Sequence, residues 1–366
     1  MGRILFFEDE DEFAARLKKR LSQELGPAVK VELAKTNLSN SVSGAKSRQR
    51  GAQPHPTFVH RLLPAIRKYG NIDLIVTDVN LSEIASYEGL SAEVVGEVGR
   101  RLFIPVCVYS RNVPSDFQRI QESVDARIKL SSNPQSPEML KEIAALYNGF
   151  MTISRLYNKL SRKQRTQTLS QTLVTILDKP HYVDRVSLYG LGNQAFLELT
   201  PMNDKAIKSD VRSKNIPYLL GRWLLGSIMK FPGLLVNEIA AASHLNISLH
   251  DFKNPNVKRL FKSAKYEGPF HQLQEFWWRY ELDATVERAK STRGLDLVRK
   301  KVGAGIKPCK CSVDPTLDAG YYCIVNHVPV SLNKSTSEIS WIPKGADLAR
   351  VSIPVYNKLK PWIGIL

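Results

Sequence analysis

The sequence of 366 residues contains no apolar run of about 18 residues, the length from which a membrane-spanning helix is expected. It also lacks the pattern of a signal peptide, because its first stretch, MGRILFFEDEDEF, becomes acidic at Glu8. Only four cysteines are present, too few and too unevenly placed for a secreted disulfide framework. We therefore expect a cytoplasmic protein that does not bind membranes.

Several motifs of common enzymes are missing as well. The chain has no G-x-x-x-x-G-K-[ST] phosphate loop, no G-x-S-x-G turn, no H-E-x-x-H zinc motif and no kinase signature. These absences argue against the corresponding NTPases, hydrolases, peptidases and kinases. A protein that turns over a substrate is therefore not the first expectation.

Negative charge is scarce in one half of the chain. The formal net charge is +17. Residues 1–150 hold 20 Lys and Arg against 18 Asp and Glu, whereas residues 151–366 hold 32 against 17. The basic second half is typical of a partner for nucleic acid or for an acidic protein, and a solubilising surface is the alternative interpretation.

Apolar and amphipathic segments alternate regularly through the first half. Short apolar runs predict five strands, at residues 3–8, 29–34, 72–77, 104–109 and 126–130. Helical spacing of apolar residues predicts five helices between and after them, at residues 10–25, 58–69, 85–102, 115–124 and 136–147. This order favours an α/β fold, a flavodoxin-like doubly wound sheet of five parallel strands.

The character of the sequence changes after this region. We expect a first domain at 1–150, a connector helix at 151–178, a mainly helical basic domain at 179–300 and a small β-rich element at 301–366. The last element is inferred from runs such as YYCIVNHVPVSL, which are rich in β-branched and aromatic residues.

Polar residues follow four of the predicted strands at the same edge of the sheet. Glu8 and Asp9 follow the first strand, Asp78 the third, Ser110 the fourth, and Lys129 lies near the end of the fifth. Clustered carboxylates repel one another unless a cation neutralises them, and Mg²⁺ prefers oxygen ligands. The pattern therefore predicts a magnesium site.

The segments ILFFEDE, DLIVTD, PVCVYS and RIK resemble the receiver domains of two-component response regulators over about the first 150 residues. The resemblance implies that Asp78 is the phosphoacceptor and that Mg²⁺ is held by Glu8, Asp9, Asp78 and the backbone carbonyl of Asn80. It further implies that Lys129 stabilises the charge of the phosphoryl group and that Ser110 hydrogen-bonds to it.

The sequence departs from the family at four places. Leu130 stands where a proline normally follows the lysine, and Ala126 stands where the aromatic switch residue is expected. Residues 37–57 form an insertion, and Asn80-Leu81 lacks the usual nearby proline. We interpret the switch as lost or rerouted through Tyr109.

The leading functional hypothesis is a signalling regulator or adaptor whose receiver controls a basic C-terminal interaction module. By analogy, the setting would be a bacterial stress or defence system, with a histidine kinase or a GHKL-type ATPase as partner. A pseudo-receiver that signals by binding alone is an open alternative.

Residues 234–266 offer a second hypothesis, a helix-turn-helix element that binds DNA or RNA. Its basic residues at helical spacing would contact phosphates. They are Lys258, Arg259, Lys262 and Lys265. An ordinary helical hairpin with a solvated basic face explains the same pattern.

Two further hypotheses concern the end of the chain. Cys309, Cys311, Cys323 and His327 include the residue types that bind Zn²⁺, although the C-x-C spacing is tighter than usual. Buried structural cysteines are the alternative. A nuclease acting through Asp314, Asp318 and His327 is the third functional hypothesis, without motif spacing to support it.

Overall fold

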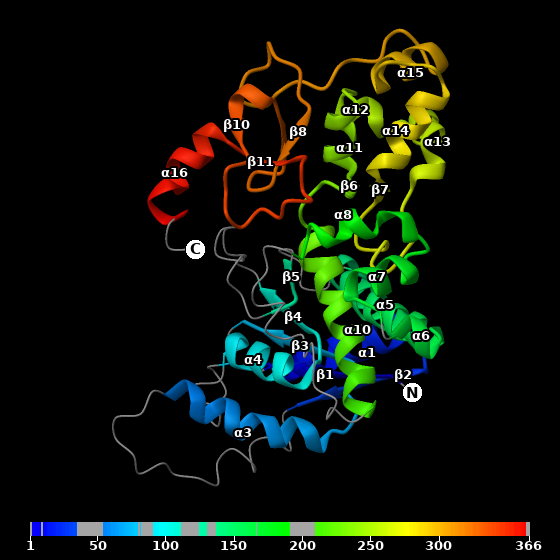
Figure 1. Ribbon diagram of the computed structural model, residues 1–366. Helices are drawn as coiled ribbons and strands as arrows, with labels where there is room; N and C mark the ends of the chain where they lie inside the picture. The colour runs from blue at the N-terminus through cyan, green and yellow to red at the C-terminus, as the bar shows by residue number, and fades with distance from the viewer. Residues whose placement is uncertain are drawn as a thin grey trace. The chain divides into compact units, whose positions relative to one another are not determined.

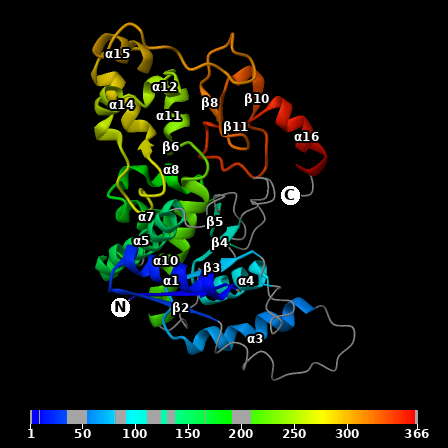
Figure 2. The same cartoon turned by 180° about the vertical axis from the view of Figure 1, so that it is seen from behind.

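The computed structural model of the chain is shown in Figures 1 and 2. The described residues are 2–8, 10–34, 54–79, 81, 91–110, 124–129, 137–165, 167–190 and 209–363. They belong to two compact units. The first comprises Met1–Asn158 and Lys208–Arg222, and the second comprises Lys159–Ile207 and Trp223–Leu366.

A five-stranded parallel sheet forms the centre of the first unit, in the order β2-β1-β3-β4-β5. Its strands are β1 (Gly2–Phe7), β2 (Val29–Leu33), β3 (Leu74–Asp78), β4 (Val106–Ser110) and β5 (Ala126–Lys129). Each lies within two residues of its predicted position at both ends. The flavodoxin-like arrangement expected from the sequence is confirmed at the level of fold.

Helices cover both faces of this sheet. The described helices that alternate with the strands are α1 (Asp11–Leu25), α3 (Pro54–Lys68), α4 (Ala92–Leu102) and α5 (Pro137–Lys159). Alternate residues of β1 point to opposite faces, so that Leu5 and Phe7 join one apolar core with α3 and α4. On the other face Phe6 packs beside Tyr109, which also contacts Phe13 of α1. Residues 115–123 of the helix expected at 115–124 lie outside the described residues.

Two helices connect the first unit to other parts of the chain. α5 continues well beyond the predicted end at residue 147, because Phe150, Ile153 and Tyr157 extend its buried face. The expected connector helix at 151–178 is therefore divided among α5, α6 (Arg162–Arg165) and α7 (Leu169–Ile176). The other connecting helix, α10 (Ser209–Trp223), lies in the first unit as far as Arg222.

The second unit is mainly helical, with two small sheets. Its helical segments are α6, α7, η2 (Pro180–Tyr182), α8 (Val183–Ser187), η3 (Leu224–Ile228), α11 (Glu238–His244), α12 (Leu249–Phe252), α13 (Pro255–Leu260), η4 (Lys262–Ala264), α14 (Arg279–Arg288), α15 (Gly294–Lys301), η5 (Leu332–Lys334) and α16 (Ile353–Ile363). Within the described ranges, no helix is long and apolar enough to cross a membrane.

Strands of the second unit form the expected β-rich element and one additional two-stranded sheet. The larger sheet has the order β10-β11-β8-β9, in which β11 and β8 are parallel and the other pairs antiparallel. Its strands are β8 (Tyr321–Cys323), β9 (Val328–Val330), β10 (Ser335–Thr336) and β11 (Ala349–Ser352). The smaller sheet pairs β6 (Leu235–Asn237) with β7 (Phe276–Trp278).

Candidate functional site

The predicted site residues lie at neighbouring strand ends on the carboxyl edge of the first sheet. Phe7 pairs with Thr77, which places Glu8 and Asp78 one residue further along β1 and β3. Asp78 pairs with Tyr109 on β4, and Ser110 pairs with Lys129 on β5. The backbone register thus places one polar residue from each of four adjacent strands at this edge.

Glu8 is a buried carboxylate with two hydrogen-bond donors beside it. The hydroxyl of Tyr109 donates to its Oε2, and the backbone N–H of Glu10 donates to its Oε1 over 3.0 Å. Tyr109 is itself buried. The sequence indicated Tyr109 as a residue of the switch but did not indicate its bond to Glu8. The ring of Tyr109 packs against Phe6 and Phe13 in the structure.

Asp78 is half-buried at the end of β3, and its Oδ1 accepts a hydrogen bond of 2.6 Å from the backbone N–H of Val79. Carboxylate oxygens of Asp78 and Glu8 are of the kind that Mg²⁺ prefers. The other two predicted ligands, Asp9 and Asn80, lie outside the described residues. Within the described part of the chain, no three His, Cys, Asp or Glu side chains are grouped to hold a metal. Magnesium at this edge therefore stays a prediction.

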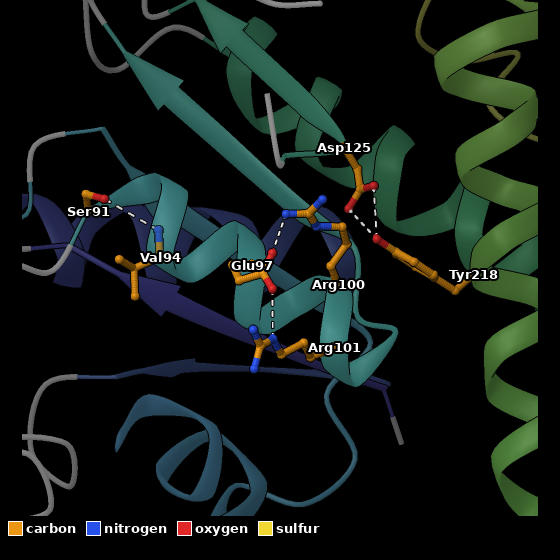
Figure 3. Close-up of polar contacts among 7 residues, drawn as sticks. All are labelled: Ser91, Val94, Glu97, Arg100, Arg101, Asp125 and Tyr218. Atoms are coloured by element: carbon orange, nitrogen blue, oxygen red, sulfur yellow. Dashed lines mark hydrogen bonds and ion pairs between the residues drawn. The ribbon is translucent and has the colours of Figure 1, made fainter. Parts of the chain in front are cut away.

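A second polar cluster lies at the opposite, amino edge of the sheet, where sequence analysis predicted none. Asp125 directly precedes β5, and its side chain is 2% exposed. Its Oδ2 accepts a 2.8 Å hydrogen bond from the N–H of Val106, the first residue of β4. Figure 3 shows its carboxylate facing Tyr218 of α10, with Arg100 of α4 beside it.

Residues of α10 provide the remaining partners of Asp125. The Tyr218 hydroxyl lies 3.3 Å from Oδ1, and Nε of Arg222 lies 3.3 Å from the same oxygen. Burial, the largest influence, raises the pKa of Asp125, while the charge of Arg222 acts in the opposite direction. Burial likewise raises the pKa of the Tyr218 hydroxyl, so that it remains a donor.

Close packing of α10 against the first unit explains why this helix belongs there. A Cβ added to Gly221 would lie 2.5 Å from Cε1 of Phe150 on α5, so only glycine permits this approach without displacing the ring. The ring of Tyr218 stacks on Phe150 and meets Phe103 edge-on. An aspartate before a strand resembles an ordinary turn residue, so no sequence pattern predicts this cluster.

The four residues predicted as zinc ligands have other partners in the second unit. Cys311 and Cys323 share a small apolar core, and Sγ of Cys323 accepts a hydrogen bond from the N–H of Ser352. Burial raises the pKa of Cys309 to about 11. His327 shares a hydrogen bond through Nδ1 with the Tyr322 hydroxyl.

The carboxylates of the nuclease hypothesis are also partnered. Lys334 lies 3.2 Å from Asp314, and Lys310 lies 2.8 Å from Asp318. The described chain groups neither these residues nor the four candidate zinc ligands as a metal site. Both hypotheses stay predictions.

Two of the four residues predicted to contact nucleic acid form ion pairs instead. Lys258 pairs with Glu238 and Glu275, and Lys265 pairs with Glu275 over 2.6 Å. The other two, Arg259 and Lys262, are exposed. The predicted helix-turn-helix region consists of the short segments α11, α12, α13 and η4, the longest of seven residues.

Comparison with known proteins gives no family assignment for this chain, since no family model matches it and no curated protein matches it significantly.

Proposed function

We propose that the first unit is a phosphoacceptor of the receiver type, in which Asp78 takes a phosphoryl group and thereby controls the second unit. The observation that supports this most is the register at the carboxyl edge, where Glu8, Asp78, Ser110 and Lys129 stand on four adjacent strands. In doubly wound sheets this edge is where ligands bind.

The proposed reaction is a transfer to the carboxylate of Asp78. One of its oxygens attacks the phosphorus of a phosphodonor and forms a P–O bond. The bond from phosphorus to the donor's leaving group breaks, and the leaving group keeps the electron pair. The ammonium group of Lys129 would stabilise the phosphoryl oxygens, and the Ser110 hydroxyl would donate a hydrogen bond to one of them.

The second unit would be the output of this switch, as a basic interaction module. The resemblance implies that the donor is a histidine kinase or a GHKL-type ATPase. Because Tyr109 neighbours Asp78 across β3 and β4 and donates to Glu8, it is the residue through which we expect a change at Asp78 to reach the core.

Intact-mass measurement tests this proposal directly. The full chain is incubated with Mg²⁺ and acetyl phosphate, and we expect a gain of about 80 Da, the mass of one phosphoryl group. The Asp78→Asn variant should gain nothing, since an amide cannot accept the group. Glu12→Gln, an exposed change on α1, is the matched control and should be modified as the wild type is.

Two outcomes would contradict the proposal. An unmodified wild-type protein would leave a pseudo-receiver that signals by binding alone. A gain of mass that persists in Asp78→Asn would place the acceptor at another residue.

A further inference from the structure

One segment of the second unit is rich in positive charge and poor in carboxylates. Residues 288–310, here called the basic segment, contain eight Lys and Arg but only one acidic residue, Asp296. The segment includes the end of α14, all of α15 and the loop that follows.

Several cations elsewhere in this unit are neutralised by carboxylates. The bases that pair with carboxylates outside the segment are Lys179, Lys253, Lys258, Lys265, Arg279 and Lys334. Within the segment, Arg293 pairs with Asp296 and Lys310 with Asp318. The exposed Lys290, Lys300 and Lys301 have no carboxylate partner among the residues that the structure describes.

Lys300 and Lys301 end helix α15, and Lys290 lies between α14 and α15. Leu295, Leu297 and Val298 form the buried side of α15. A Cβ on Gly294 would lie 2.7 Å from Leu245, which shows how closely the start of α15 approaches the end of α11. The polar side of α15 is therefore left to solvent, and it includes its last-turn cations.

Hydrogen bonds hold the return loop in place beside this helix. Nε of Arg299 donates to the carbonyl of Ile306 over 3.0 Å. The next residue, Lys307, is fixed by its backbone, which accepts from Ser248 N–H and donates to Asp251 Oδ2. An exposed lysine from the loop thus joins those of α15.

The C-terminus of α15 carries more positive charge than the helix dipole alone would balance. The dipole of a helix places about half a negative charge at its C-terminus, whereas the last turn of α15 carries three cations, Arg299, Lys300 and Lys301. The excess would attract an external anion.

The surface chemistry favours a phosphate backbone over a protein partner. Protein interfaces are enriched in aromatic and apolar anchors and depleted in lysine. The large apolar side chains of the basic segment are buried or half-buried, and the exposed ones in the described chain, Leu332 and Ile353, lie outside it. Lysines without apolar neighbours fit repeated phosphates.

We propose that the basic segment binds the phosphodiester backbone of a nucleic acid, largely without regard to base sequence. This assigns the contact to Lys290, Lys300, Lys301 and Lys307 rather than to Lys258 and Lys265. It deepens the proposed function by naming the partner class of the output unit, and it rests on that function only in treating this unit as the output.

Fluorescence anisotropy with a labelled DNA duplex, and with an RNA duplex of the same sequence, tests the proposal. The variant Lys290→Gln/Lys300→Gln/Lys301→Gln should bind at least ~10-fold more weakly at ~0.1 M salt, because each substitution removes a phosphate contact. The slope of log K against log salt should fall by about 2–3. The two duplexes show whether DNA or RNA is preferred.

A variant of identical net charge provides the matched control. Arg16→Gln/Lys18→Gln/Lys19→Gln removes three exposed cations from α1, where Glu12 and Glu24 balance the charge. Its affinity should stay within about twofold of the wild type, since general attraction to net charge is weak beside direct contacts. Circular dichroism confirms that both variants are folded.

Three results would overturn the proposal. They are absence of binding by the wild type at about 50 mM salt, equal weakening in both triple variants, and lysine-dependent binding of polyglutamate that is tighter than binding of either duplex. The last would identify an acidic protein as the partner. The Asp78→Asn variant should bind nucleic acid as the wild type does. A failure of Asp78 to accept a phosphoryl group would therefore contradict the proposed function without contradicting the proposed binding.

Discussion

Replacing Arg222 by Met is the sharpest test of how α10 is held in the first unit. Methionine keeps the length and apolar stem of the arginine but removes the cation that lies 3.3 Å from the buried carboxylate of Asp125. Asp125 would retain its bonds from Val106 N–H and Tyr218.

The size of the effect follows from the geometry. Two unit charges 3.3 Å apart attract by ~5 kcal/mol at an effective dielectric constant near 20. The Arg222 side chain is 26% exposed, so water screens part of this, and Arg100 continues to act on Asp125. We expect a loss of ~2–3 kcal/mol, at or just below the low end of the cost of breaking a buried pair.

The loss should also depend on pH. Burial already raises the pKa of Asp125, and removal of Arg222 removes the charge that opposes this rise. A carboxyl whose folded-state pKa exceeds its unfolded value binds protons better in the folded state, so stability falls as pH rises through that interval. The gap between the wild type and Arg222→Met should therefore widen as the pH rises above the ordinary pKa of an aspartate.

Hydrogen exchange followed by mass spectrometry is the suitable assay, because the chain has two units and local opening must be assigned to one of them. Peptides covering 124–129 and 215–222 should exchange ~30–150-fold faster in the variant, which corresponds to ~2–3 kcal/mol. Adding Asp125→Asn to the variant should restore much of the protection, since a neutral amide needs no cation. Unchanged exchange in Arg222→Met, or no rescue by Asp125→Asn, would refute the pairing.

Two other substitutions test packing in the first unit. Tyr109→Phe should destabilise by ~1.5–3 kcal/mol, because the lost hydrogen bond is to the buried carboxylate of Glu8. Tyr69→Phe loses a bond to the neutral carbonyl of Ala34 and should cost only ~1 kcal/mol. Equal losses of unfolding free energy in the two variants, measured by chemical denaturation, would contradict a charged bond at Glu8. Gly221→Ala should lower thermal stability, because the added Cβ would lie 2.5 Å from Phe150. Gly226→Ala, with open space around it, should not lower it. A stabilising effect of Gly221→Ala would contradict the close approach of α10 to α5.

Local patterns predicted the first sheet because each strand is specified by its own residues. The apolar run IDLIVT placed the third strand two residues before β3, and IPVCVY did the same for β4. Because these runs also mark where the strands end, they predicted that Asp78 and Ser110 lie at one edge of the sheet. The bond between Tyr109 and Glu8 depends on packing between residues 101 positions apart, which periodicity does not encode.

The place of α10 shows the limit of such reasoning more clearly. Tyr218 and Asp125 are 93 positions apart, and the chain between them passes through part of the second unit. Composition alone favours a division at residue 150, because the net charge changes from near neutral to strongly basic there. The hydrogen bonds of Asp125 and the contact of Gly221 with Phe150 depend on how the helices and strands pack together. Composition carries no information about this packing.

The short strand β5 joins the two polar clusters of the first unit. Lys129 ends this strand at the candidate phosphoacceptor edge, and Asp125 precedes it at the edge where α10 docks. Four residues of strand span ~13 Å, and β5 is the edge strand of the sheet, paired with β4 among the described strands. A shift of β5 at Ser110 would therefore move Asp125 against Arg222, the last residue of α10 before the chain enters the second unit. Removing residues 208–222 would leave the charge of Asp125 without this cation, so the proposed phosphorylation of Asp78 is to be tested on the full chain.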